Sequence, residues 1–156
     1  MQEIKYKVDL YNPKYLPYLT IISPFLAGLG YFHNLKAIKK TKQAFLTLFG
    51  SLFFTLPVIY FIISLNLPYF NDLYKIDVNS LDFEILYFCF RFILPFIIAD
   101  LISRSFSPYE LKKIGISDQT YSKSFLGLFG WYILISIIYS IFILIIFFRF
   151  ILDIQF

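Results

Sequence analysis

A short basic segment lies between two long apolar segments near the start of the chain. Residues 33–43 read HNLKAIKKTKQ and hold four lysines and no acidic residue, whereas residues 16–32 and 44–66 carry no charge. Lys and Arg accumulate in the cytoplasmic loops of membrane proteins. The segment is therefore typical of a cytoplasmic turn between two membrane spans.

The overall composition agrees with a membrane protein. Of the 156 residues, 59% are hydrophobic and 15% are charged, whereas soluble domains carry about 25% charged residues. A helix needs about 20 apolar residues to cross the hydrocarbon core, so the chain has room for four spans and little else. We predict an all-α fold, an integral membrane bundle of four transmembrane helices in a single domain over 1–156. The predicted spans cover about 16–32, 44–66, 83–103 and 125–148.

Two short sequences at the starts of the second and fourth spans are similar. FLTLFG at 45–50 and FLGLFG at 125–130 match at five of six positions, and each follows a basic connector. Two helical hairpins repeated in the same sense would give this pattern. Coincidence in a chain so rich in Phe and Leu is the alternative.

Small polar side chains recur at every fourth position of the second span, as Thr47, Ser51 and Thr55. Residues four apart share one helical face, and small residues in lipid usually mark a face that packs closely against another helix. We expect packing here, with a transport path as the alternative.

The second basic connector, 104–124, contains a helix start signal. In SPYE at 107–110, Ser107 can accept a hydrogen bond from the amide of Glu110, and proline suits the first helical position. Gly115 offers a stop. We predict a short helix over 108–114.

The positive-inside rule gives a predicted orientation. The two connectors hold eight Lys or Arg residues, against five in the terminal segments and the connection at 67–83, with Arg91 inside a span. This count favours a multi-pass protein of the cell (inner) membrane with both termini extracytoplasmic. The lysines at 5, 7 and 14 argue for the opposite side.

The third span carries charges that the other spans lack. Arg91 lies well inside it, Glu84 lies seven residues earlier on nearly the same face, and Asp100 lies nine residues later on the opposite face. A charge inside a span is a candidate functional residue. Arg91 could extend to the interface, contact backbone carbonyls, pair with an acidic side chain such as Glu84, or bind a lipid phosphate or a partner's carboxylate.

The basic segment supplies further candidate contacts. Asn34, Lys36, Lys39 and Lys40 could meet a partner or the headgroups of anionic phospholipids, which attract clustered lysines. Simple orientation of the chain is the alternative. We expect no nucleic-acid partner, because no basic stripe with interleaved aromatics is present.

The residues needed for catalysis or metal binding are scarce. The chain has one histidine, His33, and one cysteine, Cys89, which supply soft-metal and haem sites poorly. No phosphate-binding loop or HExxH motif occurs. We predict a protein that is not an enzyme and that uses no cofactor.

The run LYNPKYLPYLTIISPFLAG followed by NLKAIKKTKQA resembles the start of a family of small bacterial multi-pass membrane proteins. The positions that carry the resemblance are Tyr11, Pro24, Gly28, Asn34, Lys36 and Ala44, with a looser match over 111–124. The resemblance implies a membrane architecture and a bacterial origin, and no activity.

Three function classes agree with these features. The first is an accessory or assembly subunit of a larger membrane complex, favoured by short loops and by an Arg91 without an obvious partner. The second is a small transporter or channel-like homo-oligomer. The third is an immunity protein against a membrane-active peptide.

Overall fold

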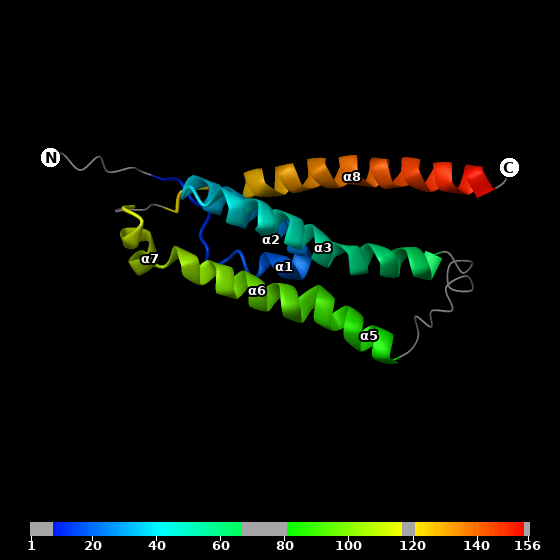
Figure 1. Cartoon of the computed structure of the whole chain (residues 1–156), viewed down its shortest axis with the longest axis horizontal. Coiled ribbons are helices and arrows are strands. Elements are labelled where there is room, and N and C mark those ends of the chain that lie inside the picture. The colour runs from blue at the N-terminus through cyan, green and yellow to red at the C-terminus, as the bar shows by residue number, and fades with distance from the viewer. Residues whose placement is uncertain (1–7, 67–80, 117–120, 155–156) are drawn as a thin grey trace. The chain divides into compact units, whose positions relative to one another are not determined.

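The structure, a computed structural model, describes residues 8–66, 81–116 and 121–154 (Figure 1). Every regular element in these ranges is a helix, which confirms the predicted all-α fold. The chain divides into two compact units, Met1–Lys123 and Ser124–Phe156. The first unit holds all the helices except the last.

The first unit begins with two helices in place of the single helix predicted over 16–32. Helix α1 covers Leu19–Ile22 and α2 covers Pro24–Ala37. They are separated by Ser23, whose backbone is extended with φ −159° and ψ 131°. The break has a local cause, because a residue that precedes proline is disfavoured in the helical conformation. Pro24 then starts α2 at a position where its missing N–H is not needed.

The two ends of this segment lie together. Tyr11, before α1, exchanges two backbone hydrogen bonds with the side chain of Asn34, near the end of α2. The chain therefore leaves this point, turns at Ser23 and comes back to it, so residues 16–32 do not form one continuous helix. The membrane crossing predicted for 16–32 stays a prediction. The sequence pattern did not predict this reversal, because a hydropathy profile has the same values whether an apolar segment runs straight or turns back on itself.

Helix α3 covers Thr41–Asn66 and contains the second predicted span. A tight turn with Lys39 at φ 61° joins it to α2. The two helices pack along each other at Gly28, where an added Cβ would lie 2.0 Å from Ser51 Oγ. The predicted packing face of α3 is thus in contact with α2 at its central residue.

The third predicted span lies in a continuous helical rod over Leu81–Phe106. It consists of α5 (Leu81–Phe88), a π-helical turn η1 (Cys89–Ile93), α6 (Leu94–Ser103) and a 3-10 turn η2 (Arg104–Phe106). In the π turn the amide of Leu94 donates to the carbonyl of Cys89, five residues back. The turn lies just before Pro95, which cannot donate to the ladder and would clash with a regular turn.

The predicted helix in the second connector is present as α7, Pro108–Lys113. Ser107 Oγ accepts from the amide of Glu110 at 3.3 Å, as the sequence pattern predicts. Gly115 follows with φ +77°, a conformation that favours glycine.

The second unit consists of helix α8, Phe125–Ile154. Two helices in the described part of the chain are long and apolar enough to cross a membrane, Leu81–Phe106 and Phe125–Phe142. The resemblance between 45–50 and 125–130 stays a prediction of a repeat.

Candidate ligand cavity and the polar groups around it

A cavity of about 510 Å³ lies between α2, α3 and α6 in the first unit. Its wall follows the three helices over similar lengths, from Pro24 to Leu35, from Gln43 to Phe54 and from Pro95 to Ser105. Ten or eleven residues of helix correspond to about 15–17 Å. The cavity is therefore elongated along the helices, and its volume is in the usual range for a ligand site.

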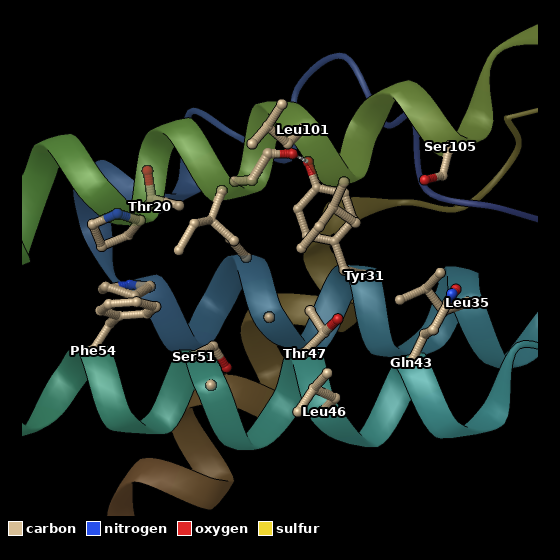
Figure 2. A pocket seen from close by; sticks show the side chains of 18 residues that line it. Thr20, Tyr31, Leu35, Gln43, Leu46, Thr47, Ser51, Phe54, Leu101 and Ser105 are labelled. Atoms are coloured by element: carbon tan, nitrogen blue, oxygen red, sulfur yellow. Dashed lines mark hydrogen bonds between the residues drawn. The ribbon is translucent and has the colours of Figure 1, made fainter.

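The two ends of the cavity differ in their surroundings. Thr20 and Phe54 lie at one end, whereas Leu35, Gln43 and Ser105 lie at the other (Figure 2). The second end adjoins the basic connectors, because Leu35 and Gln43 both lie within 33–43 and Ser105 lies within 104–124. Most of the wall between the two ends is apolar.

Tyr31 closes the space between α2 and α6. Its hydroxyl donates to the carbonyl of Ala99 at 2.7 Å, as Figure 2 shows, and its ring stacks on Phe106 with 6.3 Å between centroids. Tyr31 is 1% exposed. Sequence reasoning missed this residue, since one tyrosine among the 13 in the chain carries no distinguishing pattern.

Asn34 is fully buried and joins the N-terminal segment to α2. Its Nδ2 donates to the carbonyl of Tyr11 and its Oδ1 accepts from the amide of Tyr11, both at 2.9 Å. The side-chain amide thus imitates a β-ladder partner. Asn34 thus holds two parts of its own chain together, and its predicted contact with a partner or lipid stays a prediction.

Arg91 projects from η1 to the C-terminal end of α1. One guanidinium nitrogen donates to the carbonyl of Thr20 at 2.7 Å, and the other donates to those of Ile21 and Ile22 at 2.9 and 2.5 Å. These carbonyls need donors, because a helix leaves its last four carbonyls without intrahelical partners and Pro24 has no N–H for Thr20. Of the alternatives for Arg91, the structure shows contact with backbone carbonyls.

The third span also holds two acidic residues, Glu84, a predicted partner of Arg91, and Asp100, predicted on the opposite face. Glu84 is exposed on α5. Asp100 accepts from Arg104, one turn later, with 2.9 Å between Oδ2 and the terminal guanidinium nitrogen. Both members of this pair are well exposed, so it is a surface ion pair of small energy.

The N-terminal segment, the turn after α2 and residues 121–123 gather at one end of the first unit. The amide of Lys123 donates to the carbonyl of Leu10 at 3.4 Å, and Ser122 Oγ donates to Asp9 at 2.7 Å. Lys123 Nζ lies 5.7 Å from the ring centroid of Tyr11. Lys36 is exposed, with its ammonium 5.9 Å from the ring of Phe32. This end of the unit, which we call the basic end, also includes the exposed Lys39 and the half-buried Lys40.

His33 lies at the basic end, with its ring edge-on to that of Tyr11 at 5.3 Å. Burial lowers the pKa of His33, and the nearby Lys123 lowers it further. Both effects disfavour the charged imidazolium.

Cys89 is a free thiol in η1. No group of three or more His, Cys, Asp or Glu residues that could hold a metal lies within 8–66, 81–116 and 121–154.

The chain was compared with known proteins in three ways, and no protein-family model, curated protein or solved structure matches it.

Proposed function

We propose that the chain is a multi-pass protein of the cell membrane with three crossing helices and one segment that enters and leaves on the same side. The crossing helices are α3, the rod over 81–106 and α8. The length and hydropathy of the last two support this, and residues 44–66 of α3 carry no charge. The returning segment is the stretch between Tyr11 and Asn34. It includes most of helix α2, and most residues of that helix are buried. Such segments are tolerated at membrane depth where protein surrounds them.

This arrangement changes the proposed orientation. It places Lys5, Lys7 and Lys14 on the same side as the eight basic residues of the connectors, which gives eleven against Lys75 and Arg149. The lysines that disagreed with a four-span topology now support the cytoplasmic side. The N-terminus is then cytoplasmic, and three crossings place the C-terminus outside.

Within the membrane we propose that the protein acts by binding, as an accessory subunit of a larger membrane complex. The observation that carries this proposal is a contrast between the polar side chains inside the first unit, which are bonded within the chain, and the apolar side chains exposed on α3. Asn34, Tyr31 and Arg91 are all bonded to the backbone of their own chain. Helix α3 instead presents large apolar side chains that do not line the cavity, with Phe49 64% exposed and Phe53 58% exposed. Such a face fits the helices of another subunit.

A small transporter or channel-like homo-oligomer is the second candidate. The observation that favours it is the cavity between three helices, with Thr20, Thr47 and Ser51 in its wall.

The two candidates differ in what accompanies the protein out of the membrane. Extraction in a mild detergent followed by mass spectrometry should give a stoichiometric protein partner if the chain is an accessory subunit. Replacing Phe49 and Phe53 by Ala should then release the partner and leave the chain in the membrane fraction, whereas Leu81→Ala with Leu86→Ala on α5 should not. A homo-oligomer that retains no partner, and that loses flux when Thr47 is replaced by Val, would overturn the proposal in favour of transport.

A further inference from the structure

We propose that the cavity holds one acyl chain of an anionic phospholipid, with its phosphate at the basic end. The inference rests on the membrane location proposed above. It is carried by three features of the cavity: its apolar wall, the use of its hydroxyl groups and the charge at one end.

Three of the hydroxyl groups in the wall, those of Thr20, Tyr31 and Ser51, are already bonded. Thr20 Oγ1 donates to the carbonyl of Pro17 at 2.6 Å, and Ser51 Oγ donates to that of Leu48 at 2.7 Å. The Tyr31 hydroxyl donates to Ala99. Because these donors are satisfied by the chain itself, an apolar occupant leaves none of them without a partner. The wall therefore suits a hydrocarbon better than a polar solute.

The shape of the cavity also suits a hydrocarbon chain. It extends along three helices for about 15–17 Å, so an occupant must be long and narrow. At one end it is lined by Phe54 and Pro95, and at the other by the polar side chains of Gln43 and Ser105. This order of apolar and polar groups matches that of a lipid, whose chain ends in an ester and a headgroup.

Positive charge lies beside the polar end of the cavity. Lys36, Lys42 and Arg104 each directly follow or precede a residue of the wall, namely Leu35, Gln43 and Ser105. All three basic residues are exposed. Arg104 also pairs with Asp100, which uses one face of the guanidinium and leaves other N–H donors. Lysine and arginine clusters next to a membrane attract anionic headgroups, so a phosphate at this end fits the charge.

The test uses the full chain, purified in mild detergent and mixed with phosphatidylglycerol or phosphatidylcholine of the same acyl chains. Native mass spectrometry then counts the bound lipids. We expect one retained phosphatidylglycerol per chain, with at least a fivefold preference over phosphatidylcholine at equal concentration.

Two kinds of variant separate the acyl site from the headgroup site. Gly50→Leu should abolish retention of both lipids, because Gly50 lines the cavity and an added Cβ there meets nothing within 4 Å. Gly130→Leu on α8 is the matched control and should retain the lipid. Neutralising Lys36, Lys42 and Arg104 with Gln should remove the preference for phosphatidylglycerol while a lipid is still bound. Changing Lys112 and Lys113 of α7 in the same way should keep the preference.

Retention of lipid by Gly50→Leu at the wild-type level would overturn the proposal, as would equal retention of the two lipids by the wild type. A bound fatty acid or neutral lipid in place of a phospholipid would overturn the headgroup part. If Gly50→Leu does not fold, Ile98→Phe fills the cavity from α6 and carries the same expectations. The same preparations are used to measure how much of the chain is in the membrane fraction and whether a protein partner accompanies it. Failure of the accessory-subunit proposal is therefore distinguished from failure of the lipid proposal.

Discussion

Asn34 and Tyr11 pair side chain to backbone across 23 residues of sequence, through two hydrogen bonds of 2.9 Å. The pair brings both ends of the segment that contains α1 and α2 to the same place, and Asn34 is fully buried. One side-chain amide thereby joins the two ends of this apolar segment.

Replacing Asn34 by Ala should destabilise the protein strongly, because the buried amide and carbonyl of Tyr11 would both lose the hydrogen bonds that the Asn34 side chain supplies. Each such group costs about 1–3 kcal/mol, so the loss should be about 2 kcal/mol or more. The measurement is thermal stability in detergent, followed as the fraction that stays monodisperse on heating. Asn12→Ala is the matched control, since the side chain of Asn12 accepts only a local bond from Lys14 in an exposed turn. Equal stability of the two variants would mean that the Asn34 pair does not hold the segment.

The same pair predicts the topology. In a Cys89→Ser background, single cysteines at Asp9 and at Lys113 should react from the same side of the membrane, because both lie on the side of the connectors. An impermeant maleimide applied to intact cells should label neither, and permeabilisation should expose both. A cysteine at Asp9 that reacts in intact cells while one at Lys113 does not would restore a crossing between them.

Much of the architecture could be predicted from hydropathy and local signals. The cap at Ser107, the helix after it and the long helices at 41–66, 81–106 and 125–154 all follow from patterns within a few turns of chain. These features are determined by residues close to one another in the sequence, so a local pattern is enough to predict them.

The returning segment and the cavity could not be predicted in the same way. The break at Ser23 has a local signal in Pro24, but the return depends on the pairing of Asn34 with Tyr11, which a hydropathy profile does not register. The role of Arg91 was restricted to a few alternatives, and only the position of α1 beside η1 decides among them. The cavity depends on how α2, α3 and α6 pack together, a property of the tertiary structure.

Gly28→Ala should destabilise the contact between α2 and α3. The new Cβ would lie 2.0 Å from Ser51 Oγ and 2.4 Å from its Cβ, so the helices must separate. Overpacking of this kind costs about 1–3 kcal/mol. Combining the change with Ser51→Gly should recover most of the loss, whereas Ser51→Ala should recover less because its Cβ remains.

Gly50→Ala is the control for this prediction. The position is helical and an added Cβ meets nothing within 4 Å, so alanine should be neutral or stabilise by up to about 1 kcal/mol. A Gly28→Ala protein as stable as Gly50→Ala would contradict the close approach of the two helices.

Arg91→Leu should weaken the protein itself, since three carbonyls at the end of α1 lose their donors. Hydrogen bonds to charged groups contribute about 1.5–3 kcal/mol, and partial exposure of Arg91 places the expected loss at about 1–2 kcal/mol. Arg104→Leu removes an equal charge from an exposed pair with Asp100 and should cost less than about 1 kcal/mol. Thermal stability in detergent compares the two. An Arg91→Leu protein that keeps its stability and loses only a protein partner would show that the guanidinium binds that partner instead.

The half-buried position of His33 predicts a loss of stability in mild acid. Burial and the charge of Lys123 lower its pKa in the folded protein, with a smaller lowering from Lys36, while a backbone bond at Asp9 opposes them. The unfolded chain, with a pKa of about 6.5, then binds more protons than the folded protein between the two pKa values. The free energy of unfolding therefore falls as the pH decreases from about 6.5 through the folded pKa and levels off below it.

The measurement is the thermal midpoint of the wild type and of His33→Gln at about pH 7.5 and about pH 5.5, on either side of the unfolded pKa. The wild type should lose more stability between the two pH values than the variant, whatever their absolute midpoints. Carboxylates contribute equally to both proteins, so they cancel in this comparison. The same pH dependence in both proteins would mean that the imidazole of His33 takes up its proton as readily in the folded state as in the unfolded one.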